Sequence, residues 1–185
     1  DSSGNINTGT SVVTVTDTTR PVVVTQPLTV YLDGSGNGSI AVGQINNGSS
    51  DNCGIDSLWL DVSAFSCNNT GINTVTLFVR DSSGNINTGT AVVTVEDTIR
   101  PVVVTQALTL YLDGSGNGGI TISDINNGSS DNCGIDSLWL SITDFSCNDL
   151  GVNTVTLAVR DSSGNIGTGT ASVTVADTTR PVVVT

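Results

Sequence analysis

The sequence predicts an all-β protein made of tandem immunoglobulin-like β-sandwich repeats of 80 residues arranged as a rod. Three observations support this fold class. Residues 18–97 and 98–177 align without gaps and differ at 19 of 80 positions. Apolar and polar residues alternate with period two, which is typical of half-buried strands. Turn-forming residues recur roughly every 8–12 positions, which is typical of a sandwich of short strands.

The predicted domain boundaries follow from where the repeats begin and end. Residues 1–17 match the end of a repeat, and residues 178–185 match the beginning of one. Strands without partners are marginal in water, so we expect the chain to be a segment of a longer protein. The predicted organisation is the C-terminal fragment of a preceding repeat at 1–17, complete repeats at 18–97 and 98–177, and the N-terminal fragment of a following repeat at 178–185.

Each joint between repeats carries the sequence D-T-T/I-R-P, at 17–21, 97–101 and 177–181. Proline restricts the residue before it to extended backbone, so each linker should be short and straight. Mutual repulsion between acidic repeats also favours an extended chain. These two features predict the rod.

The elements of the first repeat are predicted from alternation and turn residues. In the strand 73–81, Val75, Leu77 and Val79 fall on one face. This strand forms a hairpin with 88–97 across the loop D-S-S-G-N, where Gly84 supplies positive φ. The other elements, in chain order, are strands at 22–26 and 27–33, a glycine-rich turn at 33–38, a strand at 39–42, an irregular segment with room for one helical turn at 43–52, and a strand at 54–65.

Composition excludes several classes of function. The net charge is −12, the chain has no histidine, and all five of its cationic residues are arginines. Nucleic acid and anionic lipid both require basic patches, so neither is an expected partner. No apolar run approaches the roughly 18 residues of a membrane helix. Without histidine or lysine there is no ordinary general base near neutral pH, so we expect no enzyme.

The four cysteines recur at the same positions in both repeats. Cys53 and Cys67 lie 14 positions apart, and Cys133 and Cys147 repeat that spacing. No C-x-x-C motif or histidine partner suggests zinc or redox chemistry. We therefore predict one disulfide within each repeat, Cys53–Cys67 and Cys133–Cys147. Such bonds would place the protein outside the cytoplasm.

A longer sequence pattern resembles a known family. The string G-x-N-T-V-T-L-x-V-R-D-S-S-G-N-I, followed by A-x-V-T-V-x-D-T and R-P, is similar to hyalin-repeat and related immunoglobulin-like modules. With Y-L-D-G-S-G-N-G, D-N-C-G-I-D-S-L and F-S-C-N upstream, it resembles tandem modules of giant Bacteroidetes cell-surface proteins. Some of those are gliding-motility adhesins exported by the type IX secretion system. The resemblance covers both complete repeats.

This resemblance implies a structural stalk segment of a long extracellular surface filament or adhesin. Its expected partners are the neighbouring repeats of the same chain, together with surface glycans or other filaments. Two alternatives remain open. Each repeat is a weak glycan-binding module that acts through avidity, or the segment is an accessory region of a secreted polysaccharide-degrading enzyme.

The glycine-rich turn has the oxygen spacing of a calcium-binding loop, with oxygens at positions 1, 3 and 5 and glycine at position 6. Gln44 stands at the twelfth position of the first copy, where the second copy has an acid. The alternative is a simple hairpin turn that uses glycine and asparagine for positive φ. The candidate calcium ligands are Asp33, Ser35 and Asn37 in the first copy, and Asp113, Ser115, Asn117 and Asp124 in the second.

Other aspartates recur near the joints and the cysteines. Asp81 and Asp161 open the D-S-S-G-N loops, where a carboxylate commonly caps backbone N–H groups. The alternative is a calcium site at the joint, with Asp17 or Asp97 nearby. The acids that flank the cysteines are expected to cap loops; they are Asp51, Asp56, Asp131 and Asp136.

Two further features are candidate contact or modification sites. Trp59 and Trp139 share a strand face with polar residues, so each is either exposed to glycans or partners or covered by the irregular segment 43–52 and its counterpart. Aspartate followed by serine or threonine and then threonine or an aliphatic residue resembles the O-glycan acceptor motif of Bacteroidetes. The candidate acceptors are Thr18, Ser57, Thr98, Ser137 and Thr178.

Overall fold

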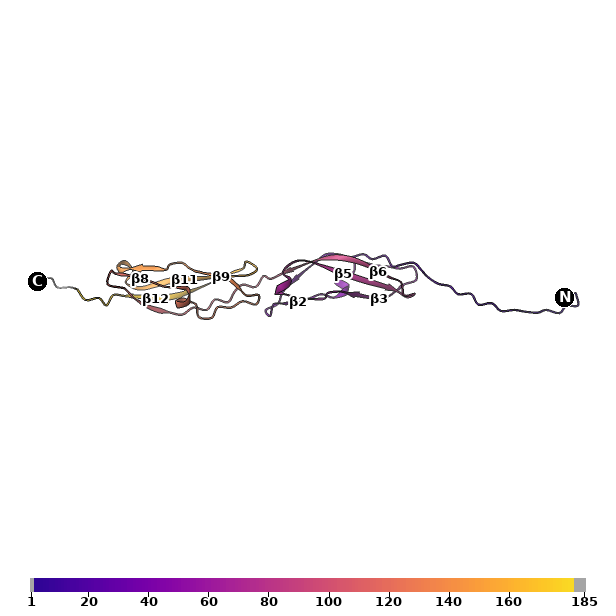
Figure 1. Ribbon diagram of the computed structural model, residues 1–185, viewed down its shortest axis with the longest axis horizontal. Helices are drawn as coiled ribbons and strands as arrows, with labels where there is room; N and C mark the ends of the chain where they lie inside the picture. The colour runs from indigo at the N-terminus through magenta and orange to yellow at the C-terminus, as the bar shows by residue number, and fades with distance from the viewer. Residues whose placement is uncertain (1, 182–185) are drawn as a thin grey trace. The chain divides into compact units, whose positions relative to one another are not determined.

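The computed structural model describes residues 2–181 and is almost entirely β (Figure 1). The chain divides into two compact units. Within the described residues, the first unit contains 2–28, 41–63 and 74–92, and the second contains 29–40, 64–73 and 93–181. The repeat predicted at 98–177 lies wholly in the second unit and therefore shows the fold undivided. The boundaries predicted from the sequence remain a prediction.

The second repeat forms two sheets. The larger sheet has four strands in the order β7-β12-β11-β9, and β10 pairs with β8 in a two-stranded sheet. β7 pairs with β12 in parallel, whereas β9 and β12 both pair with β11 antiparallel. The elements are β7 (Leu108–Tyr111), β8 (Asn117–Gly119), α2 (Ile122–Ile125), β9 (Ile135–Leu140), β10 (Asp144–Ser146), the 3-10 turn η2 (Cys147–Asp149), β11 (Gly151–Asp161) and β12 (Ile166–Ala176).

The core of this repeat lies between its two sheets. Val155, Leu157 and Val159 alternate along β11 and are fully buried. They belong to one apolar cluster with Phe145 of β10 and Ile125 of α2. Burial of one face of each strand is the main stabilising term in such a small domain. The immunoglobulin-like sandwich predicted from the alternation is therefore confirmed.

The first repeat forms the same elements in the same order. Its larger sheet has the strand order β1-β6-β5-β3, and β2 pairs with β4. Val75, Leu77 and Val79 are fully buried, as the alternation predicts. The helical turn expected in the irregular segment is α1. The elements are β1 (Leu28–Tyr31), β2 (Asn37–Ser39), α1 (Val42–Ile45), β3 (Ile55–Leu60), β4 (Ala64–Ser66), η1 (Cys67–Asn69), β5 (Gly71–Asp81) and β6 (Ile86–Glu96).

Two predicted strands differ in the structure. The run 54–65 is not one strand but two, β3 and β4, which belong to different sheets. Asp61 ends β3, because its Oδ1 accepts hydrogen bonds from the N–H groups of Val62 and Thr76, each at 2.8 Å. A side chain that takes a backbone donor in this way competes with the sheet ladder.

The segment 22–26 is also not a continuous strand. Val22 and Thr25 form only isolated bridges, to Ser50 and Asn46. Between them, the N–H of Val24 donates to the Ser49 hydroxyl at 3.0 Å rather than to a backbone carbonyl. The serine side chain therefore replaces one rung of the ladder.

The cysteine pairing predicted within each repeat is wrong. Cys67 is bonded to Cys133, with an S–S distance of 2.09 Å and Cα atoms 5.3 Å apart, and Cys53 and Cys147 are free and exposed. The physical reason is the position of the loops. Cys53 lies in the first compact unit, whereas Cys67 and Cys133 both lie in the second. The loop at Asn132 packs on the turn after β1, since Asn132 Nδ2 donates to the Asp33 carbonyl at 3.2 Å.

Candidate metal centre

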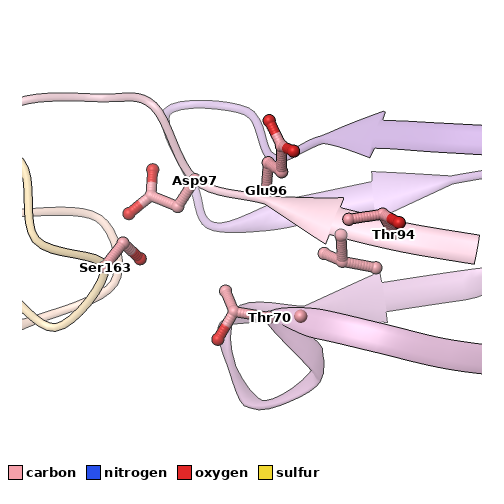
Figure 2. A pocket seen from close by; sticks show the side chains of 7 residues that line it. Thr70, Thr94, Glu96, Asp97 and Ser163 are labelled. Atoms are coloured by element: carbon pink, nitrogen blue, oxygen red, sulfur yellow. The ribbon is translucent and has the colours of Figure 1, made fainter.

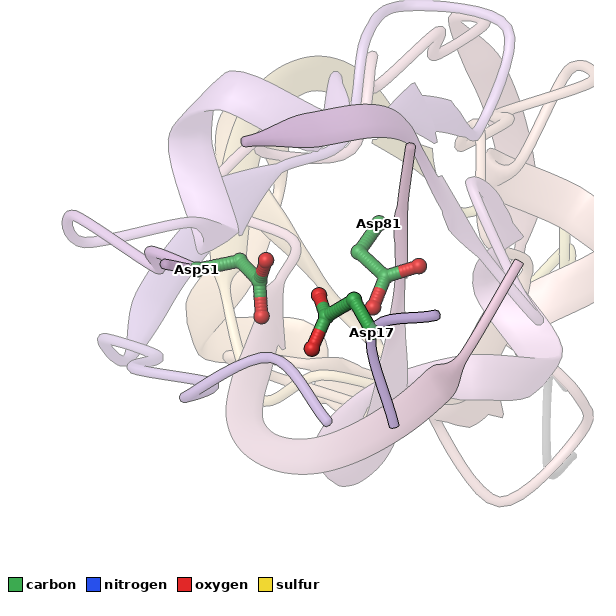
Figure 3. A group of neighbouring side chains, drawn as sticks. All are labelled: Asp17, Asp51 and Asp81. Carbon is green, nitrogen blue, oxygen red and sulfur yellow. The ribbon is translucent and has the colours of Figure 1, made fainter. Parts of the chain in front are cut away.

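Two groups of three aspartates bring their carboxylates together. In each group, one carboxylate oxygen from every member lies within 4.8 Å of the others. In Figure 3 the three carboxylates of the first group point toward one another. Each member of one group has its counterpart in the other at a distance of one repeat length in sequence. The first cluster is Asp17, Asp51 and Asp81, and the second cluster is Asp97, Asp131 and Asp161.

Asp161 is the most strongly held member of the second cluster. It is the last residue of β11 and is 1% exposed. Its Oδ1 accepts from the N–H groups of Ser163 and Asn165 at 2.9 and 2.8 Å. Its Oδ2 accepts from Asn165 Nδ2 at 2.8 Å, and the same amide donates to the Asp97 carbonyl at 3.0 Å. The predicted capping role of this aspartate is confirmed, and the turn that it caps also holds the joint residue Asp97.

Asp97 and Asp131 each use one oxygen for the backbone and leave the other unpaired. Asp97 Oδ1 accepts from the Ile99 N–H at 3.1 Å and from Asn132 Nδ2 at 3.2 Å. Asp131 Oδ1 accepts from the Cys133 N–H at 2.8 Å. The Oδ2 atoms of both residues are buried and lack a hydrogen-bond partner. Asp97 as a whole is only 7% exposed. A buried, unpaired carboxylate oxygen is costly unless something compensates its charge.

The first cluster repeats this arrangement. Asp17 Oδ1 accepts from the Thr19 N–H at 2.9 Å, and Asp51 Oδ1 accepts from the Cys53 N–H at 2.8 Å. Asp17 Oδ2 and Asp51 Oδ2 are again buried without a partner. Asp81 is fully buried, and its turn holds it as Asp161 is held. Equivalent hydrogen bonds in two repeats with sequence differences elsewhere indicate a built arrangement.

The electrostatics of the clusters are unbalanced. Burial raises the pKa of Asp131, and the negative charges of Asp161 and Asp97 raise it further, against the hydrogen bond from Cys133. The N–H of Thr19 lowers the pKa of Asp17. Within residues 2–181 the structure shows one ion pair, Arg80–Asp56 at 3.9 Å, and it lies outside both clusters. No arginine of the described chain forms an ion pair with either group of carboxylates.

Two pockets border the second cluster. A pocket beside it contains Asp97 in its wall, and Figure 2 shows the carboxylate of Asp97 on the side of Ser163. Another pocket is lined by Asp131 and Asn132. The first of these pockets is lined by Thr70, Gly71, Thr94, Val95, Glu96, Asp97 and Ser163.

The calcium loops predicted from spacing are hairpin turns. Asp33 Oδ1 accepts from the N–H groups of Ser35 and Asn37 at 2.8 and 3.0 Å, and these two bonds lower its pKa. Asn37 Nδ2 donates to the Ser35 carbonyl. The second copy at Asp113 has the same geometry. Calcium binding here stays a prediction. The hydrogen bonds within each turn already explain why aspartate, serine and asparagine occupy these positions.

The twelfth-position acid of the second loop has another role. Asp124 Oδ2 accepts from the backbone N–H and the hydroxyl of Thr121, each at 2.7 Å, and so caps α2. Among the described residues it belongs to neither carboxylate cluster. The residues assigned only to loop capping prove more informative, since Asp51 and Asp131 cap with one oxygen and join a cluster with the other. The sequence signal for the clusters was that Asp17, Asp51 and Asp81 all recur 80 positions later, as Asp97, Asp131 and Asp161.

The tryptophans are partly exposed on the outer face of their strands. Trp59 is 39% exposed and Trp139 is 43% exposed. Trp59 stacks on Phe78 with ring centroids 5.2 Å apart. Trp139 lies opposite Ala158 in the ladder and has no such ring beside it. Of the two possibilities for these side chains, exposure is confirmed; a glycan or partner contact stays a prediction.

The candidate O-glycan acceptors lie in two settings. Thr18, Thr98 and Thr178 are exposed at the joints. Ser57 and Ser137 are half-buried on β3 and β9, and their hydroxyls donate to the preceding aspartates at 3.2 and 3.1 Å. The exposed threonines are the more accessible acceptors, and modification at all five positions stays a prediction.

Fold and site together define a tandem β-sandwich protein with a carboxylate cluster that recurs once per repeat. No family model matches the chain, and no curated protein matches it. Among solved structures, it is similar to human mucin-like protocadherin EC1-2, with 12% identity, a TM-score of 0.39, and coverage of 85% of this chain and 98% of that one.

Two other solved structures show the same level of likeness. Protocadherin gamma B2 domains 3–6 match at 16% identity and a TM-score of 0.41, covering 85% of this chain and 52% of that one. The Ig1-2 module of the Drosophila receptor protein tyrosine phosphatase DLAR matches at 9% identity and a TM-score of 0.27, covering 85% and 100%. Likeness at this level carries no argument about ligands or function.

Proposed function

We propose that this chain is a structural stalk segment of a long extracellular surface filament or adhesin, and that it is not an enzyme. The observation that carries the proposal is the bond between Cys67 and Cys133, which covalently connects two successive sequence repeats. Disulfides persist in oxidising surroundings outside the cytoplasm. A covalent bond from one repeat to the next suits a protein whose repeats provide reach.

Polar contacts support the same proposal at the joint. Asn165 Nδ2 donates to the Asp97 carbonyl, and Asn132 Nδ2 donates to the Asp33 carbonyl at 3.2 Å. Both bonds connect residues that are far apart in sequence, and both belong to the second compact unit. Within the described chain, no helix is long and apolar enough to cross a membrane.

A narrower identification rests on the sequence resemblance. The repeated strings around D-S-S-G-N and D-N-C-G-I-D-S-L support a giant Bacteroidetes surface protein, such as a gliding-motility adhesin exported by the type IX system. In that setting adhesion resides elsewhere in the protein, and the direct partners of this segment are its neighbouring repeats.

Small-angle X-ray scattering of proteins with two, four and six copies of the repeat tests the stalk. A strand of 8–10 residues spans roughly 30 Å at about 3.3 Å per residue, so each repeat should add roughly 35–45 Å with its joint. Maximum dimension should rise in equal steps. Compact particles, or a radius of gyration that grows like that of a flexible chain, would rule the stalk out.

Glycan binding is a second candidate, and the exposure of Trp59 and Trp139 favours it. Aromatic faces of this kind stack on sugars. A glycan array probed with a multivalent form of the chain should then give signals that disappear when both tryptophans are changed to alanine. The stalk proposal expects no such signal.

A further inference from the structure

We propose that each of the two carboxylate clusters binds one calcium ion. We also propose that the Cys67–Cys133 disulfide increases the affinity of the second cluster for calcium. This proposal does not depend on the stalk function. The ligands are Asp17, Asp51 and Asp81 in the first site, and Asp97, Asp131 and Asp161 in the second.

The spacing of the oxygens fits the size of a calcium shell. Calcium–oxygen distances are about 2.3–2.6 Å, so ligands on opposite sides of the ion are about 4.6–5.2 Å apart. For magnesium the corresponding separation is about 4.0–4.2 Å. In each cluster the carboxylate oxygens lie within 4.8 Å of one another. One ion can therefore contact an oxygen of every member, and calcium is favoured because its shell is flexible, whereas magnesium demands near-ideal octahedral geometry.

The unpaired oxygens point to a bound cation independently of the clustering. Asp97 is only 7% exposed, and its buried Oδ2 lacks a hydrogen-bond partner. The Oδ2 of Asp131 is buried and unpaired as well. Two buried carboxylate oxygens without a donor in one cluster are rare in folded proteins. A cation with a preference for oxygen compensates both of them.

The chemistry of the donors selects calcium over transition metals. The second site offers carboxylate oxygens, and the chain contains no histidine. Soft metals select thiolate and imidazole, whereas calcium takes six to eight oxygens in a flexible shell. Within the described chain, the free thiols belong to Cys53 and Cys147, and neither is a member of a cluster.

The disulfide holds a ligand of the second site. Asp131 Oδ1 accepts from the N–H of Cys133, which is bonded to Cys67. Asn132, between them, donates to Asp97 Oδ1. The loop 131–133 is thus fixed covalently on one side and by the joint on the other. In the first site, the equivalent Cys53 is free, which makes that site an internal comparison without a disulfide.

Calorimetric titration of the full chain with calcium chloride tests the proposal. The parent should bind two ions, the second site more tightly than the first, and Asp131→Asn should leave only the weaker binding. Asparagine keeps the Oδ1 acceptor for Cys133 N–H, so circular dichroism should show an unchanged fold. Loss of a metal's outer-shell partner alone typically costs 10–100-fold in affinity, so loss of this ligand should cost at least about tenfold.

Three further variants make the result specific. Asp51→Asn should remove the weaker binding instead, and Asp97→Asn should act like Asp131→Asn. Asp144→Asn removes one charge from β10, outside both clusters and outside the two pockets that border the second cluster, so it should bind like the parent. Magnesium chloride should give weaker binding at both sites. Reduction of the disulfide should weaken only the tighter site, by several-fold.

Some results would overturn the proposal. Absence of saturable calcium binding to the parent is one, and equal affinities for the parent, Asp131→Asn and Asp144→Asn are another. Loss of binding on Asp33→Asn with Asp113→Asn, but not on Asp131→Asn, would move the sites to the hairpin turns. Unchanged affinity after reduction would remove the role assigned to the disulfide.

Discussion

Cys67 and Cys133 are joined across 66 residues of sequence, with their Cα atoms 5.3 Å apart. Cys67 follows β4 in one repeat, and Cys133 precedes β9 in the next. Cys147 and Cys53 occupy the equivalent positions one repeat away and carry free thiols. The structure therefore uses the two cysteine positions of the repeat to connect different repeats rather than to staple one.

Peptide mapping without reduction should find this pairing. Proteolysis and mass spectrometry of the oxidised chain are expected to show a Cys67–Cys133 peptide, with Cys53 and Cys147 available to an alkylating reagent. The exposure of both free thiols explains their expected reactivity. Detection of Cys53–Cys67 and Cys133–Cys147 instead would restore the pairing suggested by sequence spacing and contradict the structure.

Removal of the bond should destabilise the chain. Closing a loop of 66 residues restricts the unfolded state by about 4 kcal/mol in the chain-entropy description. Cys133→Ser should lower the free energy of unfolding by up to that amount in urea titrations. Cys147→Ser, at the equivalent of Cys67, provides the control and should change it little. Equal effects of the two substitutions would show that the bond contributes nothing in solution.

Two glycines in equivalent turns should respond differently to alanine. A Cβ at Gly36 would lie 2.5 Å from Cys67 Sγ and 3.0 Å from the Asn132 carbonyl oxygen; at Gly116 it would meet only Cys147 Sγ, at 2.6 Å. Both glycines have positive φ, so both substitutions carry backbone strain. Because the disulfide holds Cys67 and the free Cys147 can rotate, Gly36→Ala should lower the melting temperature more.

Reduction supplies the check on that comparison. If the fixed sulfur causes the extra cost of Gly36→Ala, the difference between the two variants should shrink when the disulfide is reduced. A difference that persists unchanged under reducing conditions would assign the cost to the Asn132 carbonyl alone.

The ring stack in the first repeat should be measurable against the second. Trp59 and Phe78 are neighbours across β3 and β5 with ring planes 8° apart, and the second repeat has Ala158 in place of the phenylalanine. Aromatic pairs contribute about 0.5–1.5 kcal/mol beyond burial. Phe78→Ala should therefore cost at least that much in the free energy of unfolding. Ala158→Phe should recover a similar gain beside Trp139, and a loss there would contradict the explanation.

Acid should weaken the hairpin turns at Asp33 and Asp113. Backbone N–H groups of Asn37 and Ser35, and of Asn117 and Ser115, lower the pKa of these carboxyls in the folded chain. A lowered folded pKa gives stability that is present above the unfolded value, near 3.9, and is lost as the pH falls through the folded value. The urea concentration at the midpoint of unfolding should therefore decrease when the pH is lowered below about 4.

A double variant separates this effect from that of the other acids. Asp33→Asn with Asp113→Asn keeps an oxygen acceptor in each turn but removes its titration. The midpoint of this variant should fall less than that of the parent between neutral pH and acid, in buffer without calcium. An identical pH profile would show that these two carboxyls do not contribute.

Local pattern was sufficient for much of this protein. The alternation of Val75, Leu77 and Val79 identifies the buried face of β5, because side chains of a strand point to opposite sides in turn. The role of Asp161 as the cap of its turn was also predictable, because a carboxylate reaches N–H groups only two and four residues away. These interactions are short in sequence, so a short sequence window contains all their participants.

Only the tertiary structure decided the disulfide partner and the carboxylate clusters. Cys67 had a cysteine 14 positions away, but the loop that packs beside it carries Cys133. Asp97, Asp131 and Asp161 are likewise separated by 34 and 30 positions and meet because a joint, a loop and a strand end converge. These contacts depend on which loops the two sheets bring to the same end of the sandwich. The number of residues between two positions does not determine their distance in space.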